Sequence, residues 1–187
     1  YMIYLDNAAT TKIYNIAQQA RAFAEDKAFA NSSSIHSFGL KSSNLLRESR
    51  EIISSVIGSN PDEIYFTKGA TEANNIVISS LSGENNIAIT SSIEHSSVYD
   101  SFKNNIFKEV IYLKNDNYGF IDIEDLKDKL QNDVKLVSII YANNETGTIQ
   151  DIRKISDIVK SFDKNILIHI DATQALGKIS CDVNEIK

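Results

Sequence analysis

The chain has few of the residue types that build metal sites and disulfide frameworks. Its 187 residues include one cysteine, one methionine, three histidines and no tryptophan. A single cysteine, Cys181, excludes an internal disulfide and a cysteine-rich metal site. The histidines, His36, His95 and His169, show no paired ligand spacing, so we expect no zinc site made by this chain alone.

Long apolar runs and an excess of basic residues are also missing. No apolar stretch approaches the roughly 18 residues of a membrane span, and the N-terminus lacks a basic region followed by an apolar core. The net charge is -6 and the pI is near 5.1, which argues against a nucleic-acid or anionic-membrane partner. With 42% hydrophobic and 24% charged residues, the composition favours a globular cytoplasmic protein.

Hydrophobic periodicity changes character near Pro61. Before it, apolar residues recur at helical spacing over 13–24 and 36–57, with Gly58 as a stop signal, and residues 3–5 have an extended pattern. After it, short apolar runs alternate with amphipathic segments. We expect strands over 63–67, 86–91, 109–113, 135–141 and 166–170, and helices over 71–81, 96–105, 123–130 and 152–162. Such alternation predicts an α/β fold with a mainly parallel sheet and helices on both faces.

The stretch from Ile166 to Gln174 places a carboxylate and an amide together at a strand end. Its apolar first half ends at Asp171, and Gln174 follows three residues later. The carboxyl ends of strands in an open α/β sheet form the ligand crevice, so a site is expected here. An alternative remains open, in which Asp171 caps the following turn and Gln174 faces water.

Residues 66–75 pass from a predicted strand through Gly69 to a helix start. Free backbone N–H groups at such a start, with the Thr71 hydroxyl, suit an anion. The segment has neither the Gly-x-Gly-x-x-Gly spacing nor the Lys-Ser/Thr of a Walker loop, so it is neither of the two common nucleotide loops. Alternatively, Thr71 is an ordinary helix N-cap.

Two further strand ends carry polar side chains. His95 follows the strand over 86–91, where it could titrate near neutral pH or lie against a flat ligand. It could equally be a helix-start histidine bonded to nearby backbone. Asn143 and Asn144 follow the strand over 135–141, where they either supply amide donors or adopt left-handed turn conformations. Four polar strand ends together favour a convergent site.

The chain resembles a known family in five motifs that occur in order and cover essentially its whole length. The motifs are 6–11 (Asp-Asn-Ala-Ala-Thr-Thr), 69–75 (Gly-Ala-Thr-Glu-Ala-Asn-Asn), 94–95 (Glu-His), 143–147 (Asn-Asn-Glu-Thr-Gly) and 169–174 (His-Ile-Asp-Ala-Thr-Gln). They are similar to those of cysteine desulfurases of the NifS/IscS type. That family consists of class V aminotransferase relatives that depend on pyridoxal 5'-phosphate (PLP) and have the aspartate-aminotransferase fold, fold type I.

The resemblance implies a role for each strand-end residue. Asp171 looks like the carboxylate that pairs with the PLP pyridinium nitrogen and keeps it protonated. Gln174 and Asn144 match residues near the phenolic oxygen of the ring. His95 resembles the catalytic histidine that stacks over the ring and moves protons.

The remaining matches concern the phosphate and the supporting residues. Ala70 and Thr71 match the phosphate cup of the family. His36 matches a motif histidine, for which we expect a packing role. His169 alternates onto the same face as Asp171, so we expect it to support that carboxylate.

Two expected residues are missing from this chain. The family's cofactor-binding lysine lies in a Ser-x-His-Lys motif on the next strand, and its sulfur-accepting cysteine lies on a later loop. Cys181 comes too early, so we interpret it as structural, and Lys178 and Lys187 lack the motif context. We therefore expect an N-terminal portion with an incomplete large domain, weak PLP binding at most and no turnover.

The resemblance also predicts domains and partners. Residues 1–12 would belong with the small domain, and 13–187 would form the first part of the large domain. The full homodimeric protein would be a sulfurtransferase that takes sulfur from L-cysteine, giving L-alanine and an enzyme persulfide. Its partner would be a sulfur acceptor or a scaffold protein in iron–sulfur cluster or thiocofactor assembly. Two alternatives are another class V PLP enzyme, such as a selenocysteine lyase or an aminotransferase, and a naturally short, non-catalytic binding or dimerisation protein.

Overall fold

The computed structural model describes residues 2–186, so Tyr1 and Lys187 lie outside the described part. The chain forms two compact units, the first ending at Tyr65 and the second beginning at Phe66. The predicted domain division after residue 12 stays a prediction.

The first unit is helical. It holds α1 (Asn15–Lys27), α2 (Ser37–Ile57) and the 3₁₀ turn η1 (Pro61–Glu63), which confirms both expected helices. His36 has an edge-on ring contact with Phe38, with centroids 6.4 Å apart, and also a capping role that we did not expect. It is the N-cap of α2, and its Nδ1 accepts a hydrogen bond from the Gly39 N–H at 3.2 Å. The stop at Gly58 is confirmed, since its φ of 68° is a left-handed conformation that favours glycine.

The strand expected over 63–67 does not form, and the piece expected to be extended at residues 3–5 lies outside the sheet. Neither belongs to a β-ladder, and Glu63 lies in η1 instead. The apolar pattern over 63–67 misled the prediction because a β-strand also needs a neighbouring strand to pair its backbone groups. Tyr65 and Phe66 are exposed, with 82% and 53% of their surfaces accessible, so the apolar run does not mark a buried strand.

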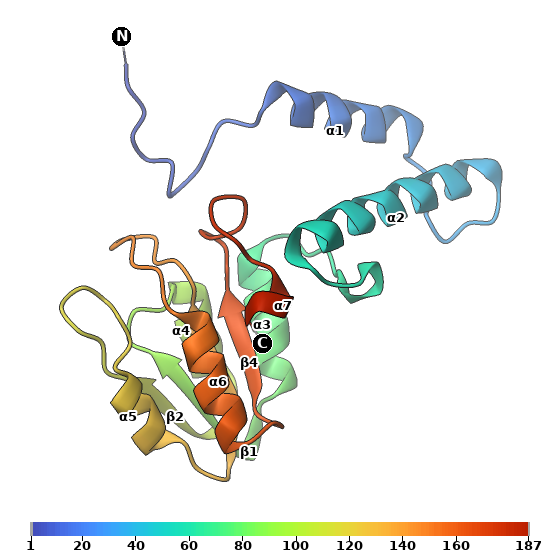
Figure 1. The fold of residues 1–187 in the computed structure, drawn as a ribbon. Helices are drawn as coiled ribbons and strands as arrows, with labels where there is room; N and C mark the ends of the chain where they lie inside the picture. The colour runs from blue at the N-terminus through green and yellow to red at the C-terminus, as the bar shows by residue number, and fades with distance from the viewer. Residues whose placement is uncertain (1, 187) are drawn as a thin grey trace. The chain divides into compact units, whose positions relative to one another are not determined.

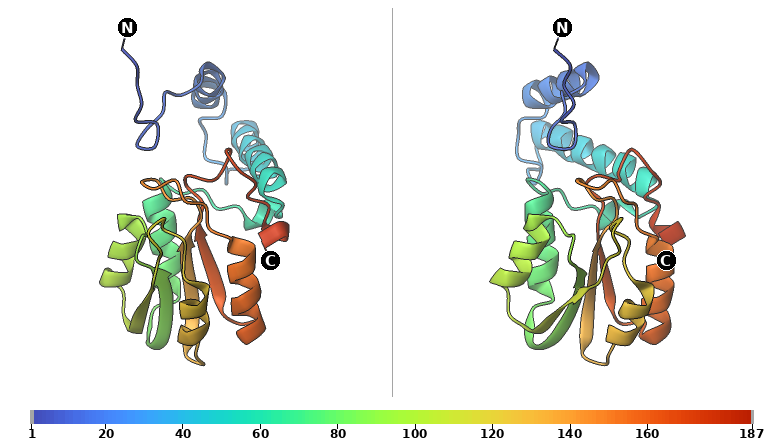
Figure 2. Two further views of the ribbon diagram at one scale, coloured as in Figure 1. Left: turned by 60° about the vertical axis from the view of Figure 1, so that its left-hand side comes forward. Right: turned by 90° about the vertical axis from the view of Figure 1, so that its left-hand side faces the viewer.

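The second unit is built on a four-stranded parallel sheet, in which every pair of neighbours is parallel and the order is β2-β1-β3-β4. Its strands are β1 (Gly83–Ser91), β2 (Phe107–Leu113), β3 (Val134–Ile140) and β4 (Leu167–Asp171). Its helices are α3 (Ala70–Ser80), α4 (Ser96–Asn104), α5 (Ile123–Lys129), α6 (Ile152–Phe162) and α7 (Val183–Ile186). Figure 1 shows the strands side by side, and the two turned views in Figure 2 show helices on either side of them. The predicted α/β fold class is therefore confirmed.

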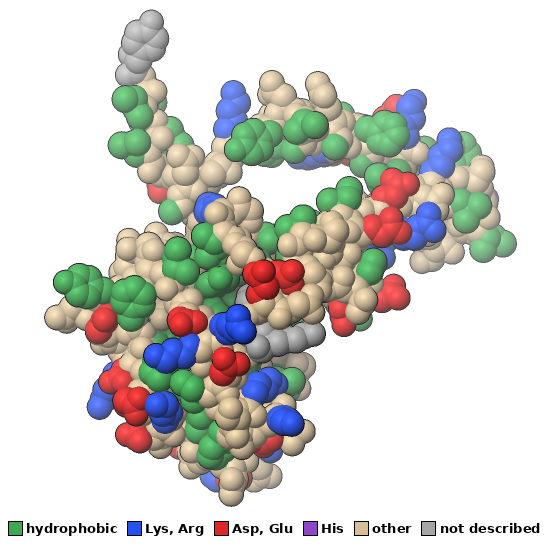
Figure 3. Space-filling view, in the orientation of Figure 1, with side chains coloured by type: hydrophobic (Ala, Val, Ile, Leu, Met, Phe, Trp, Pro, Cys, Tyr) green, Lys and Arg blue, Asp and Glu red, His purple; other side chains and the backbone are tan. Residues whose placement is uncertain are grey.

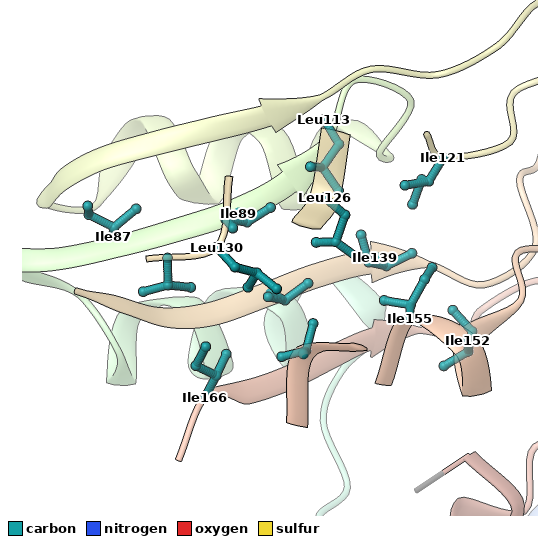
Figure 4. Packing of buried hydrophobic residues seen from close by; sticks show 13 residues of the cluster. Ile87, Ile89, Leu113, Ile121, Leu126, Leu130, Ile139, Ile152, Ile155 and Ile166 are labelled. Carbon is teal, nitrogen blue, oxygen red and sulfur yellow. The ribbon is translucent and has the colours of Figure 1, made fainter. Parts of the chain in front are cut away.

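Two apolar clusters cover the two faces of the sheet. The larger one includes residues of α5 and α6, and Figure 4 shows its side chains lying against the strands. The smaller one includes Ile78 of α3 with Val98 and Phe102 of α4. Ile87 and Ile89 of β1 belong to the larger cluster and the intervening Ala88 to the smaller, as the alternation of side chains along a strand requires.

The surface carries charges of both signs. On the face drawn in Figure 3, acidic and basic side chains are interspersed over the second unit. In the described part of the chain, no helix is long and apolar enough to cross a membrane. Residues 2–186 also contain no cluster of three or more histidine, cysteine, aspartate or glutamate side chains that could hold a metal ion.

Parallel pairing puts the carboxyl ends of the strands at one edge of the sheet. Ile140 at the end of β3 pairs with Asp171 at the end of β4, and Ser138 pairs with His169. The loops that follow β1, β3 and β4 therefore start at this edge. They carry the polar residues singled out in the sequence.

Candidate functional site

Asp171 is the last residue of β4, and only 5% of its surface is exposed. Its Oδ1 accepts from the Thr173 N–H at 3.0 Å, and its Oδ2 accepts from the Asn74 side-chain amide at 3.0 Å. Burial acts to raise the pKa of Asp171, but hydrogen bonds from the side chain and backbone of Thr173 and from Asn74 outweigh it and lower the pKa below its ordinary value. Asp171 thus does cap the following turn, and it is also an ionised, nearly buried carboxylate at a strand end.

Asn74 of α3 is the centre of the polar network around Asp171. It is 4% exposed, and its amide nitrogen also lies 3.0 Å from the Ser97 hydroxyl. Its amide oxygen lies 3.1 Å from Nε2 of His169, whose Nδ1 lies 2.8 Å from the Ser138 hydroxyl. His169 therefore supports Asp171 through Asn74. Burial lowers the pKa of His169, so its ring is neutral at neutral pH.

His95 is the N-cap of α4, as the structural alternative for this residue predicted. Its Nδ1 accepts from the Ser97 N–H at 3.2 Å and lies 2.8 Å from the Ser97 hydroxyl. Its Nε2 has no hydrogen-bond partner within residues 2–186. The exposed ring is therefore anchored through one nitrogen and offers the other to a ligand.

Helix α3 begins one residue earlier than predicted. Gly69 is its N-cap, so the alternative in which Thr71 caps the helix is wrong. Ala70 and Thr71 instead occupy the first turn, where backbone N–H groups have no partner inside the helix. Glu72 turns back, and its carboxylate accepts from the Lys68 N–H at 2.6 Å. The exposed hydroxyl of Thr71 and the helix start together suit an anion.

The consecutive residues Asn143 and Asn144 make different contacts. Asn143 is buried and holds its loop together, since its amide donates to the Ile93 carbonyl at 2.9 Å and its Oδ1 accepts from two backbone N–H groups. No hydrogen bond of the Asn144 side chain is found in the described part of the chain, which leaves it available to a ligand. No residue other than glycine has a positive φ among those described, so the left-handed alternative for both asparagines is wrong.

Gln174 lies in the turn after β4 and does not simply face water. Its Oε1 accepts a hydrogen bond from the Lys178 ammonium at 2.7 Å. Lys178, the first lysine after the motif at 169–174, is therefore hydrogen-bonded to Gln174.

Glu94 belongs to the Glu-His motif at 94–95, but the sequence analysis gave it no role at the site. Its Oε1 accepts from the Ser91 hydroxyl at 2.5 Å and from the Ile140 N–H at 2.9 Å. Its Oε2 is buried and finds no partner within the described residues. Burial raises the pKa of Glu94 to about 7, and the charge of Asp171 adds to the effect. Its position at a strand end, directly before His95, is the signal that could have identified it.

These contacts tie the strand ends into one site. Asn74 joins α3 to Asp171 and, through Ser97, to His95. Thr71 lies one helical turn before Asn74, so both are on one face of α3. An ionised carboxylate, an imidazole nitrogen and a helix start that favours anions suit a flat ring that carries a protonated nitrogen and a phosphate. The chemistry of this donor set fits PLP.

Comparisons with known proteins agree with this chemistry. Residues 3–187 match the family model described as aminotransferase class V. The cysteine desulfurase IscS of Dictyoglomus turgidum is 42% identical over 191 residues, covering 98% of this chain and 48% of the relative. The NifS/IcsS protein homolog of Lactobacillus delbrueckii subsp. bulgaricus is 43% identical over 185 residues, covering 95% of this chain and 47% of the relative.

Solved structures give the same picture. A NifS-like protein superposes with a TM-score of 0.93 at 32% identity, covering 99% of this chain and 52% of the other. A structure described as SspA in complex with cysteine has a TM-score of 0.89 at 32% identity, covering 98% of this chain and 54% of the other. The chain spans about half the length of the curated relatives it matches.

Proposed function

Because this chain belongs to the aminotransferase class V family, we propose that it forms part of a PLP-dependent cysteine desulfurase. The observation that carries the proposal is the buried Asp171 carboxylate at the end of β4, which the Asn74 amide holds at 3.0 Å. A buried carboxylate costs free energy unless it is paired. Hydrogen bonds from Thr173 and Asn74 keep Asp171 ionised, so its negative charge would favour a protonated ring nitrogen as its partner.

In this proposal, different residues of the second unit would bind different parts of the cofactor. Asp171 would bind the ring nitrogen and keep its proton in place. The first turn of α3, with Ala70 and Thr71, would bind the phosphate. His95 would lie over the ring and move a proton through Nε2, while Asn144 and Gln174 would meet the polar edge of the ring. PLP, when bound, supplies an electron-accepting ring that stabilises negative charge on the substrate's α-carbon.

We further propose L-cysteine as the substrate of the whole protein, with its sulfur passing to a cysteine outside this chain and L-alanine as the other product. The names of the relatives as cysteine desulfurases support this choice, as does the neighbour described in complex with cysteine. The proposal includes a homodimer, a cytoplasmic location and a sulfur-accepting or iron–sulfur scaffold protein as partner. With cysteine and PLP, we expect this chain to release no more sulfide than free PLP does.

The proposed cofactor site, made by Asp171, His95 and the first turn of α3, can be tested without covalent chemistry. PLP reacts with exposed lysines, so the probe is 4'-deoxypyridoxine 5'-phosphate, which has the ring and the phosphate but no aldehyde. Its binding to this chain is measured by equilibrium dialysis at pH 7.5. We expect saturable binding that is lost for 4'-deoxypyridoxine, the same molecule without the phosphate. Equal uptake of both molecules would contradict the phosphate site at α3.

A matched pair of variants tests the carboxylate. Asp171→Asn removes the charge that would meet the ring nitrogen, so we expect about tenfold weaker binding, as for the loss of one charge-assisted hydrogen bond. Asp157→Asn makes the same change on the exposed face of α6 and should bind as the parent chain does. If both variants bound the PLP analogue with equal affinity, the proposed role of Asp171 in the cofactor site would be overturned.

A further inference from the structure

The hydrogen bonds around Asn74 have only one consistent direction. An ionised carboxylate can only accept, so the Asn74 group that faces Asp171 at 3.0 Å must be its amide NH₂. The amide oxygen then points the other way, to His169. The orientation of this side chain is therefore fixed by chemistry, and the rest of the network follows from it.

One side of the hydrogen-bond network runs from the amide oxygen of Asn74 to His169. An amide oxygen only accepts, so the Nε2 of His169, 3.1 Å away, must carry a hydrogen and donate it. In a neutral imidazole the other nitrogen is then an acceptor, and Nδ1 takes the hydroxyl hydrogen of Ser138 at 2.8 Å. Ser138 is fully buried, so its hydroxyl cannot turn to water in place of Nδ1.

The other side of the network runs from the amide nitrogen of Asn74, through Ser97, to His95. The second N–H of Asn74 donates to the Ser97 oxygen at 3.0 Å, which leaves the Ser97 hydroxyl hydrogen to be donated onward. Its neighbour at 2.8 Å is Nδ1 of His95, which also accepts from the Ser97 backbone N–H. With two donors aimed at it, Nδ1 is an acceptor, and the hydrogen of the neutral ring belongs on Nε2.

We propose that Asn74 is a positioning residue that sets the direction of hydrogen bonding across the site, so that His169 and His95 both carry their hydrogen on Nε2. His95 would then present an N–H, and no lone pair, to a bound ligand. The inference deepens the proposed function, on which its catalytic meaning rests. The hydrogen-bond directions themselves are properties of the chain without cofactor.

The test is a long-range ¹H–¹⁵N NMR spectrum of the cofactor-free chain with ¹⁵N-labelled histidine, above pH 7. For His169 we expect a slowly exchanging Nε2–H signal and an acceptor-type Nδ1. For His95 we expect an acceptor-type Nδ1 as well. A hydrogen on Nδ1 of either ring in the parent chain would overturn the proposal. The result does not depend on whether the PLP analogue binds, so the two proposals fail separately.

Variants show whether Asn74 is the cause. In Asn74→Ala, we expect the His169 Nε2–H exchange with water to accelerate at least about tenfold, as for the loss of one buried hydrogen bond, and the His95 Nδ1 shift to move. Asn75→Ala, at the next residue of α3, is the matched control, because within residues 2–186 the hydrogen bond of its amide goes to the Thr71 carbonyl and not to this network. His36 is an internal reference, since its Nδ1 accepts a hydrogen bond from the Gly39 N–H and takes no part in this network. An Asn74→Ala spectrum identical to that of the parent would contradict the proposal.

A third variant keeps the inference testable if Asn74→Ala does not fold. Ser138→Ala removes the donor to Nδ1 of His169 but leaves Asn74 in place. If Asn74 sets the direction, the hydrogen stays on Nε2. If Ser138 sets it, the hydrogen redistributes to Nδ1, and this outcome would refute the role of Asn74.

Discussion

The amide of Asn74 lies 3.0 Å from the carboxylate of Asp171, although 97 positions separate them in the chain. This contact joins the first turns of α3 to the carboxyl end of β4. It holds a charged group in place where few water molecules can reach it. We expect this pair to stabilise the second unit as well as its site.

Loss of the Asn74 amide should destabilise the unit in a pH-dependent way. Hydrogen bonds to charged groups contribute about 1.5–3 kcal/mol, so Asn74→Ala should lower the free energy of unfolding by roughly 2 kcal/mol at pH 7. The pKa of Asp171 is lowered in the folded state, so its ionic stabilisation is present above its unfolded pKa and is lost as the pH falls through the folded value. Urea unfolding at pH 7 and pH 3 should show the smaller difference at pH 3. A cost that is the same at both pH values would contradict an ionised Asp171.

Glu94 should make the chain less stable as the pH rises. Its folded pKa of about 7 lies above its ordinary value, so its contribution is fully present below the unfolded pKa and is lost as the pH rises through 7. Glu94→Gln cannot ionise. Between pH 5 and pH 8, the unfolding free energy of the parent chain should fall relative to this variant by roughly 3 kcal/mol. Parallel urea-unfolding curves for the two chains would argue against a buried proton on Glu94.

Cys181 should react slowly with thiol reagents in the folded chain. It is buried, with 9% of its surface exposed, and burial raises the pKa of its thiol. Because the thiolate is the reactive form, we expect iodoacetamide to modify Cys181 at least about tenfold more slowly in buffer than in 8 M urea. Mass spectrometry over time gives both rates. A fast reaction in buffer would instead indicate an activated thiol and would contradict the structural role.

The larger apolar cluster should dominate the stability of the second unit. Ile155 of α6 is 1% exposed within it, so Ile155→Ala should cost about 3 kcal/mol through lost burial and a residual cavity. Ile76→Ala is the same substitution at a helix position that is 55% exposed, and it should cost less than about 1 kcal/mol. Equal costs, measured by urea unfolding, would mean that α6 does not pack on the sheet in solution.

The fold was largely predictable because regular elements leave a local pattern. Helix α6 has the bounds 152–162 that its spacing predicted, and the four strands of the sheet were all expected within a few residues. The strand predicted over 63–67 failed because pairing depends on a neighbour, which a local window does not contain. The early start of α3 at Ala70 shows how uncertain element ends are when glycine serves as the cap.

The sequence by itself determined the alternation of strands and helices, the family resemblance and the polar residues at the strand ends, because all of these depend on neighbours within a few positions. Asn74 and Glu94 lie within the matched motifs, but only the tertiary structure showed which groups they contact at the site. The partners of Asn74 are 23, 95 and 97 positions away, and Glu94 binds a backbone group 46 positions away. Such contacts form because parallel strands bring their carboxyl ends together, and no local pattern of residues records which side chains then meet.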